Sequence, residues 1–283
     1  MRPSRKKKIF RLRNIILVCL LALVGSMAVY FVYPNVGKLK KENPKKSAFM
    51  EYREAEWAEK GKKIKIAQYW VPLGSISPAL VKAVLIGEDD KFYQHEGFDF
   101  DAMQKAIEKD IAEKKFKFGG STISQQLAKN LYLTPSKNPV RKVKEAILTW
   151  RIENTLSKKR ILELYLNVAE WGEGIFGIEA AARHYYGKSA AGLSPYEAAR
   201  LAAVLPNPRK FNPLGQSRYV ENRSRIIYGI MQRRGIAPPD LDEISEYKTE
   251  SAVPEPPGID PKGAGTDSPG SHRNGSQPTK ESL

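Results

Sequence analysis

A long uncharged apolar segment near the N-terminus constrains the fold of this chain most strongly. No charged residue occurs at positions 14–37, and the 19 residues from Ile15 to Tyr33 are almost continuously apolar. A helix of about 20 such residues crosses the hydrocarbon core of a bilayer. A cleaved signal peptide is the alternative, because Ser26-Met27-Ala28 resembles a cleavage site. Since the apolar run continues past that site, we expect an uncleaved transmembrane anchor at residues 14–36.

The charges that precede this segment predict its orientation. The first 13 residues carry seven Lys or Arg side chains and no acidic side chain. Basic residues stay on the cytoplasmic side of a membrane span, so we expect residues 1–13 in the cytoplasm and the rest of the chain outside it. The single cysteine, Cys19, lies within the span, which excludes a disulfide framework and a cysteine-rich zinc site.

The net charge of +16 leaves nucleic acid, an anionic membrane or a phosphate-bearing substrate open as partners. A content of 41% hydrophobic and 28% charged residues predicts a packed core and excludes a wholly disordered chain. Seven positive charges belong to the leader, and residues 47–247 carry a net charge of only +6. This moderate excess suits a phosphate-bearing substrate at a membrane surface, and a domain outside the cytoplasm argues against nucleic acid.

Three further segments follow the leader and the anchor. We interpret residues 37–64 as a juxtamembrane linker that includes a lead-in helix. Residues 65–247 are dense in helical patterns and poor in alternating strand patterns. Residues 248–283 are expected to be disordered, since 16 of the last 33 residues are Pro, Gly or Ser. The predicted fold class is therefore mainly α, with one domain on a single transmembrane helix.

Glu88 is the first candidate for a chemical role. A helix beginning near Pro78 would place Glu88 in the middle of an apolar stripe. That stripe consists of Val81, Val84, Leu85 and Phe92. A carboxylate on an apolar face is costly without a partner, and burial raises its pKa toward the range that a general base needs. The alternative is that Gly87 ends the helix and leaves Glu88 on a loop or in a structural ion pair.

The segment from Gly119 to Asn130 is typical of a loop that enters a capped helix. Ile123, Leu127 and Leu131 would face the core of the protein. The separate polar face would consist of Thr122, Gln126 and Lys129. A helix N-terminus with a nearby lysine suits an anion such as a diphosphate, although a solvated polar face is the alternative.

The helix expected at residues 140–156 carries the charged pair Arg141 and Glu145 on an otherwise apolar row. We assign Val143, Ile147 and Trp150 to a second apolar stripe. The solvent face would consist of Lys142, Thr149 and Glu153. A buried structural salt bridge is the alternative for the pair. Two glutamates, an arginine and a lysine in one cleft would suit glycosyl chemistry, in which paired carboxylates are usual.

Several other features are interpreted without a catalytic role. His95 has no second His or Cys nearby and is expected to be structural, as is Glu163. Ser194 to Glu197 forms a capping box with Pro at the first helical position, which predicts a helix through Leu205. The glycine-rich run at residues 171–177 is expected to be a mobile loop over a cleft.

Taken in order, these segments resemble the signatures of the peptidoglycan glycosyltransferases, glycosyltransferase family 51. Glu88–Gly97 resembles E-D-x-x-F-x-x-H-x-G, and Gly119–Asn130 resembles G-G-S-T-I-T-Q-Q-x-x-K-N with Ser124 in place of the last Thr. The third, fourth and fifth signatures are matched by Arg141–Glu145, Lys159–Asn167 and Gly174–Lys188. No transpeptidase motif set follows, so the resemblance is to a monofunctional member.

The resemblance implies a lysozyme-like α fold and polymerisation of lipid II into β-1,4-linked glycan strands. The reaction inverts the anomeric carbon and releases undecaprenyl diphosphate. Glu88 would be the general base and Glu145 the second catalytic glutamate, while Lys129 and Arg141 would hold and neutralise the diphosphate. The other cleft residues that the resemblance implies are Lys142, Thr122, Gln126, Asp89, Phe92 and His95.

The resemblance also implies lipid II and the growing glycan as partners, together with other cell-wall synthesis proteins. The expected location is the bacterial inner membrane, with the catalytic domain on the periplasmic side. No cofactor is required if Lys and Arg neutralise the diphosphate, and Mg²⁺ or Mn²⁺ at the diphosphate is the alternative. A lysozyme-like hydrolase or lytic transglycosylase is disfavoured because glycan cleavage releases no diphosphate. An inactive cell-wall scaffold is disfavoured by the two intact glutamates.

Overall fold

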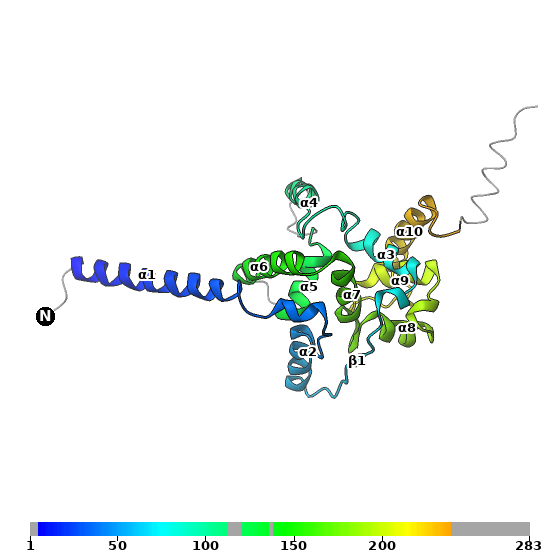
Figure 1. Ribbon diagram of the computed structural model, residues 1–283, viewed down its shortest axis with the longest axis horizontal. Helices are drawn as coiled ribbons and strands as arrows, with labels where there is room; N and C mark the ends of the chain where they lie inside the picture. The colour runs from blue at the N-terminus through cyan, green and yellow to red at the C-terminus, as the bar shows by residue number, and fades with distance from the viewer. Residues whose placement is uncertain (1–4, 113–119, 136–137, 239–283) are drawn as a thin grey trace, which may run out of the picture. The chain divides into compact units, whose positions relative to one another are not determined.

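The structure is a computed structural model in which residues 5–112, 120–135 and 138–238 are described (Figure 1). The predictions for residues 1–4, 113–119, 136–137 and 239–283, which include the tail at 248–283, lie outside the described residues. In chain order the described elements are α1 Arg5–Val29, η1 Val36–Lys40, α2 Ala48–Glu59, β1 Ala67–Gln68, η2 Leu73–Ser75, α3 Pro78–Glu88, α4 Phe100–Ala112, α5 Ile123–Tyr132, α6 Pro139–Thr155, α7 Lys158–Val168, β2 Glu170–Gly172, β3 Ile175–Phe176, α8 Ile178–Tyr186, η3 Ala190–Gly192, α9 Pro195–Val204 and α10 Arg218–Arg233.

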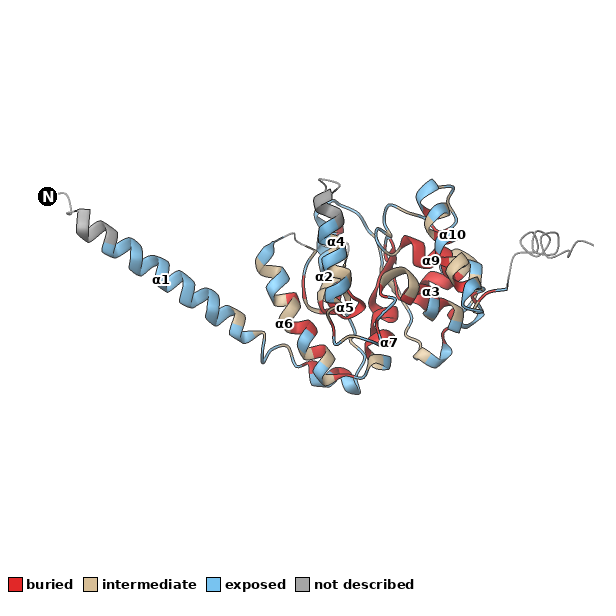
Figure 2. Ribbon diagram, turned by 90° about the horizontal axis from the view of Figure 1, so that it is seen from above, coloured by how far each residue is buried: buried red, intermediate tan, exposed pale blue. Residues whose placement is uncertain are grey.

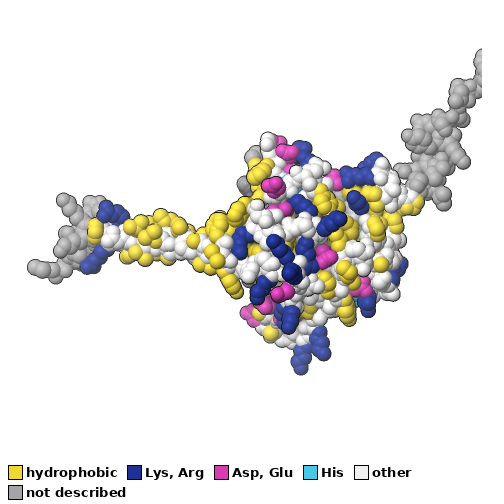
Figure 3. Space-filling view, viewed as in Figure 1, with side chains coloured by type: hydrophobic (Ala, Val, Ile, Leu, Met, Phe, Trp, Pro, Cys, Tyr) yellow, Lys and Arg dark blue, Asp and Glu magenta, His cyan; other side chains and the backbone are white. Residues whose placement is uncertain are grey.

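Helix α1 includes residues 14–29 of the membrane anchor that was expected at residues 14–36. Within the described ranges, Phe10–Val29 is the one stretch long and apolar enough to cross a membrane, with a mean hydropathy of 2.2 and none of it buried. Figure 3 shows hydrophobic side chains along this helix. Directly after it, the Arg151 guanidinium donates to the carbonyls of Tyr30 and Val32, both at 2.9 Å. The end of the anchor is therefore bound to α6.

Reciprocal capping fixes the start of α5 and of α9. The Thr122 hydroxyl accepts from the Gln125 backbone N–H at 3.2 Å, and the Gln125 side chain accepts from the Thr122 N–H at 3.0 Å. Ser194 and Glu197 make the equivalent pair at 3.3 and 2.8 Å. Because each box satisfies two backbone donors that lack helical partners, it defines the first turn. The capped helix expected within residues 119–130 and the capping box predicted at Ser194 to Glu197 are both found.

The hydrophobic core is built from two sets of helices. Helix α9 packs against α3 and α10, whereas α5 packs against α6 and α7. Figure 2 shows buried residues in α3, α5, α7 and α9. The core includes Val84 of α3, Ile123 and Leu127 of α5, and Leu148 and Ile152 of α6, all without exposed surface. Val84, Ile123 and Leu127 were predicted to lie on apolar faces by their helical spacing. The mainly α fold class is confirmed.

A small sheet crosses this helical domain in the strand order β1-β3-β2, with β1 parallel and β2 antiparallel to β3. Strands β2 and β3 fall in the glycine-rich run, where Trp171 and Phe176 are fully buried. The expectation of a mobile loop at residues 171–177 is therefore wrong. Gly177 has a φ of 79°, and a Cβ there would lie 2.7 Å from the Asn167 carbonyl oxygen, so this glycine permits close packing.

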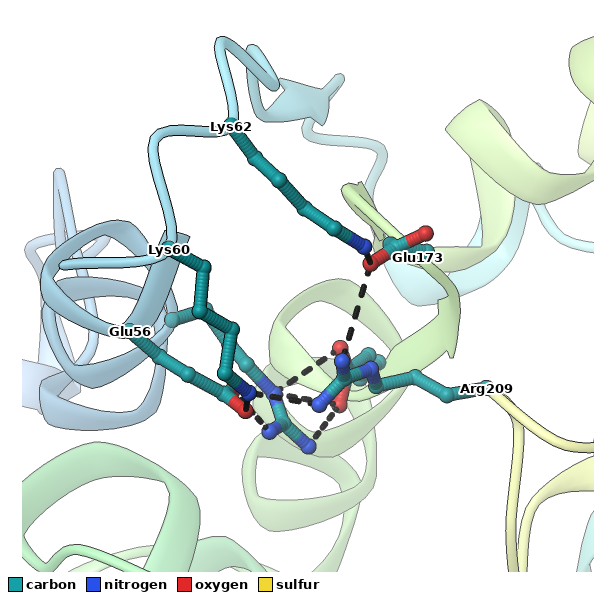
Figure 4. Close-up of polar contacts among 7 residues, drawn as sticks. Glu56, Lys60, Lys62, Glu173 and Arg209 are labelled. Atoms are coloured by element: carbon teal, nitrogen blue, oxygen red, sulfur yellow. Dashed lines mark hydrogen bonds and ion pairs between the residues drawn. The ribbon is translucent and has the colours of Figure 1, made fainter. Parts of the chain in front are cut away.

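An ion-pair network joins α2 to the β2–β3 hairpin and to the turn after α9 (Figure 4). The Arg53 guanidinium donates to Glu170 at 2.9 Å and to Glu56 at 2.8 Å. Arg209 lies 3.1 Å from Glu56 and 3.6 Å from Glu173. The outer members of the network are Lys60 and Lys62. These contacts fix α2 against segments more than 100 residues away in the chain.

The segment at 37–64 contributes buried side chains to the domain. Leu39 belongs to the main core, and Met50 and Trp57 form a second cluster with Phe176. This segment contains the lead-in helix that was expected, α2. The domain boundary at residue 65 stays a prediction.

Helix α6 presents faces that differ from those expected. Val143 and Trp150 are each 52% exposed, whereas Thr149 has no exposed surface. The Glu153 side chain is 7% exposed and accepts from Lys158 of α7 at 2.8 Å. The assignment of Thr149 and Glu153 to the solvent face is wrong, because packing against α5 and α7 decides which face of an amphipathic helix is covered.

Candidate active site

Glu88 is the last residue of α3, directly before the chain leaves the helix. Asp89 has φ of −164° and ψ of 77°, so the helix cannot continue to Phe92, and the expected stripe from Val81 to Phe92 is wrong at its end. Phe92 is nevertheless fully buried, and the Lys158 ammonium lies 4.5 Å from its ring centroid. The chain therefore uses Phe92 to pack the turn after Glu88.

Two side chains from distant elements hold the Glu88 carboxylate. Gln126 of α5 donates from Nε2 to Oε2 at 2.9 Å, and Arg223 of α10 donates from Nη2 to Oε1 at 3.1 Å. The carboxylate is 9% exposed. Burial raises the pKa of Glu88, and the Gln126 hydrogen bond and the Arg223 charge oppose that rise. A buried carboxylate with a raised pKa has the character of a general base.

Lys129 lies one turn after Gln126 on the same helix. Among the described residues it has neither a hydrogen bond nor an ion pair from its ammonium group. Burial lowers the pKa of Lys129, and the nearby charges of Glu145 and Glu88 oppose this, whereas Arg141 and Lys142 reinforce it. A largely buried ammonium without a partner is costly unless an anion binds it. Lys129 is therefore a candidate ligand for an anionic group.

Glu145 is buried on the inner face of α6 and is held by two cations of the same helix. Arg141 lies 2.5 Å from one carboxylate oxygen, and Lys142 pairs with the other. Because all three interact electrostatically with Lys129, as does Glu88, the five charged side chains face one region. The structure thus brings together both predicted glutamates and all three predicted cations, although their roles stay predictions.

The other predicted site residues serve the framework in this structure. Asp89 accepts from His95 Nε2 and from the Ile123 backbone N–H, both at 2.9 Å. His95 Nδ1 accepts from the Gly97 N–H at 3.1 Å, so the neutral ring carries its proton on Nε2. The Thr122 hydroxyl donates to the Gly97 carbonyl at 2.7 Å. These bonds attach the turn after Glu88 to the start of α5. Whether His95 also has a part in the site stays a prediction.

Within the part of the chain that the structure describes, two cavities adjoin the Glu88–Gln126 hydrogen bond. The larger, of about 310 Å³, is bordered by Glu88 and Thr122 and contains the acidic side chains of Asp90, Asp99 and Asp101. The smaller, of about 170 Å³, has a more basic lining. Its polar and charged lining residues include Gln126, Lys129, Asn130, Tyr165, Arg53, Glu170 and Arg209. A substrate that reaches both Glu88 and Lys129 would therefore extend along both sides of Gln126.

The acidic side chains of the larger cavity are already engaged. Asp101 pairs with Lys91 at 2.9 Å, Asp90 pairs with Arg234, and Asp99 caps α4. Within residues 5–112, 120–135 and 138–238, no three His, Cys, Asp or Glu side chains are arranged as a metal site. Lys129, Arg141 and Lys142 are described cations that could bind an anionic group.

Comparison with known proteins identifies the family. Residues 57–232 match the family described as Transglycosylase. The chain belongs to the transglycosylase family. It is 50% identical over 194 residues to a biosynthetic peptidoglycan transglycosylase of Nitrosospira multiformis. The aligned residues cover 69% of this chain and 84% of that protein. A protein of the same name from Dechloromonas aromatica is 52% identical over 67% of this chain and 82% of its own length. A third, from Methylobacillus flagellatus, is 46% identical over 75% of this chain and 93% of its own length.

Family membership confirms the resemblance drawn from the motifs, including the lysozyme-like character of the helical domain and its assignment as a glycosyltransferase. In this transglycosylase the sequence reasoning missed Arg223, which lies 135 residues after Glu88 in the chain. Its helix carries several basic residues, and no spacing rule distinguishes the one that reaches the site. The hydrogen bond from Tyr165 to Gln126 at 3.0 Å was also missed, although Tyr165 lies in the fourth motif.

Proposed function

We propose that this transglycosylase polymerises lipid II into β-1,4-linked glycan strands and releases undecaprenyl diphosphate. The observation that carries the proposal is the largely buried ammonium of Lys129, which has no hydrogen-bond or ion-pair partner among the described residues. It interacts electrostatically with Glu88, Glu145, Arg141 and Lys142. Hydrolysis of a glycan releases no diphosphate, so a hydrolase would have no leaving-group charge for this ammonium to neutralise. The relatives described above carry the name of the same activity.

In the proposed reaction Glu88 is the general base. Its carboxylate removes the proton from the 4-hydroxyl of the acceptor sugar, and that oxygen attacks C1 of the donor sugar. The bond between C1 and the diphosphate oxygen breaks in the same displacement, which inverts C1. The raised pKa of Glu88 supports this role, because a base with a pKa closer to the working pH accepts a proton more readily.

The leaving diphosphate takes the bonding electrons and gains negative charge. Lys129 and Arg141 are proposed to hold and neutralise it, and Glu145 is proposed to keep Arg141 and Lys142 in position through their ion pairs. Preorganised cations at a developing charge lower the barrier without moving during the reaction. With these cations in place, we propose that the reaction needs no bound metal.

The proposed location is the bacterial inner membrane. Helix α1 serves as a single anchor with a cytoplasmic N-terminus, and the catalytic domain lies on the opposite side. The exposed Trp150 of α6 lies edge-on to Phe31, directly after the anchor, with 6.3 Å between ring centroids. The site on α6 therefore lies close in space to the end of the anchor and to the membrane, where a lipid-linked substrate is found. Other cell-wall synthesis proteins are proposed as partners.

A two-substrate assay tests the proposal against its main alternative. The detergent-solubilised protein is incubated in parallel with lipid II and with purified glycan strands. We expect long glycan from lipid II and no shortening of the strands. Shortened strands would favour a hydrolase or lytic transglycosylase, and no change in either substrate would favour the scaffold.

A further inference from the structure

The fourth motif, Lys159–Asn167 on α7, has no part in the reaction described so far. Two of its polar side chains serve the framework: Glu163 accepts from the Leu73 N–H at 2.8 Å, and Asn167 accepts from the Val71 N–H at 2.9 Å. Tyr165 differs from both. Its ring is 99% buried, yet its hydroxyl points to a side chain of the site, Gln126.

Tyr165, Gln126 and Glu88 form a chain of hydrogen bonds. The Tyr165 hydroxyl donates to Gln126 Oε1 at 3.0 Å, and Gln126 Nε2 donates to Glu88 Oε2 at 2.9 Å. A primary amide has one accepting end and one donating end, whereas an ionised carboxylate only accepts. A half-turn of the amide would therefore put its oxygen against the carboxylate and lose the bond.

We propose that Tyr165 is a positioning residue that acts through Gln126: its hydroxyl holds the amide so that the N–H end faces Glu88. The inference rests on the proposed function of Glu88 as the base. Because Tyr165 is buried on α7, which packs against α5, its hydroxyl is held against Gln126 before any substrate binds. The amide then stabilises the ionised carboxylate, which is the form that can accept the proton from the acceptor hydroxyl.

Tyr165→Phe removes the hydroxyl and keeps the ring. Without the hydroxyl the Gln126 amide can turn. Glu88 then keeps its hydrogen bond from Gln126 Nε2 for only part of the time, and this bond favours the ionised carboxylate. We expect kcat for lipid II polymerisation to fall about three- to tenfold with little change in KM. The acid limb of the pH–rate profile should move to higher pH by about half a unit. If Tyr165 had a purely structural role, Tyr165→Phe would lower the amount of folded enzyme and leave the acid limb of the pH–rate profile unchanged.

The matched control is Tyr185→Phe. The Tyr185 hydroxyl also donates one hydrogen bond, to the Trp171 carbonyl at 3.1 Å, and makes no contact with Glu88 or Gln126. This variant should keep the wild-type acid limb. An equal shift in both variants would overturn the proposal, because the effect would then follow from the loss of any buried hydroxyl.

A second variant tests whether Tyr165 acts through Gln126. Gln126→Met removes the amide and should move the acid limb in the same direction as Tyr165→Phe. In the Gln126→Met background, Tyr165→Phe should add no further shift, whereas additive shifts would contradict the proposal. If Tyr165→Phe alone fails to fold, as judged by circular dichroism, an unshifted limb in Gln126→Met would still overturn it.

A substrate-free measurement separates this proposal from the proposed function. The side-chain ¹H–¹⁵N amide signal of Gln126, assigned by its loss in Gln126→Met, should shift as Glu88 titrates and should be unresponsive in Glu88→Gln. Tyr165→Phe should reduce that shift at least twofold, and an unchanged shift would overturn the positioning role. If the wild type failed to polymerise lipid II while this signal behaved as expected, the proposed function would be wrong and the positioning of Glu88 by Tyr165 would stand.

Discussion

Arg223 of α10 donates to the Glu88 carboxylate at 3.1 Å and, from the same nitrogen, to the Gly87 carbonyl at 2.6 Å. One guanidinium therefore binds both the last backbone turn of α3 and the side chain that ends it. This contact joins the proposed base to a helix that none of the motifs includes. It also supplies the positive charge that limits the rise in the pKa of Glu88.

Removal of this guanidinium should weaken the base at neutral pH. In Arg223→Ala the pKa of Glu88 should rise further, because burial raises this pKa and the Arg223 charge that lowers it would be gone. We expect turnover at pH 7 to fall by about tenfold or more and the acid limb to move to higher pH. Polymerisation rates measured between pH 5 and 9 test this. The control is Arg225→Ala, which removes a 72% exposed arginine of the same helix and should leave the profile unchanged.

The Glu88→Gln variant should be more stable than the wild type at neutral pH. The pKa of Glu88 is raised in the folded protein. Such a carboxyl destabilises the folded state at every pH at which the same carboxyl is ionised in the unfolded chain. The gain should be roughly 2–4 °C in the unfolding midpoint at pH 8 and should vanish below about pH 4, where both states are protonated. Thermal unfolding followed by circular dichroism measures it. A gain that is constant from pH 4 to 8 would contradict a role for Glu88 ionisation.

Lys129→Ala and Arg141→Ala should each slow polymerisation by about 100-fold or more, because a developing charge on the diphosphate would lose a preorganised cation. Steady-state rates with lipid II test both variants. Lys60→Ala serves as the control, since Lys60 pairs with Glu56 on the surface of α2. Near-wild-type turnover in both site variants would remove the proposed diphosphate site.

Polymerisation should persist after metal removal. The proposed neutralisation of the diphosphate uses Lys129 and Arg141, which are side chains of the protein itself. We expect less than about a threefold change in rate when EDTA is added to enzyme and lipid II. A loss of activity that added Mg²⁺ or Mn²⁺ restores would establish a divalent cation in the reaction.

Helical spacing located the parts of the site that lie on single helices. Gln126 and Lys129 were assigned to one face of α5, and Glu145 was assigned to an otherwise apolar row of α6, because these relations depend only on residues within one helix. The apolar stripe of α3 likewise pointed to Glu88, although its end at Asp89 was missed. These features follow from local sequence.

Features that depend on packing between distant segments were missed. Val143 and Trp150 have the spacing of a core stripe and yet are half exposed, because α5 covers the opposite side of α6. Arg223 reaches Glu88 only because α10 lies against α3. The β2–β3 hairpin was taken for a loop because its strands are short and because β3 pairs with β1, about 100 residues earlier in the chain.

Conversion of lipid II by the wild type and by Glu88→Gln tests the central claim most directly. Gln keeps the size of the side chain and can still bond to Arg223 or Gln126, but it cannot accept the acceptor proton. We predict that the wild type forms long glycan and that the variant, folded by circular dichroism, loses activity by about 100-fold or more. Normal polymerisation by the folded variant would show that Glu88 is not the base.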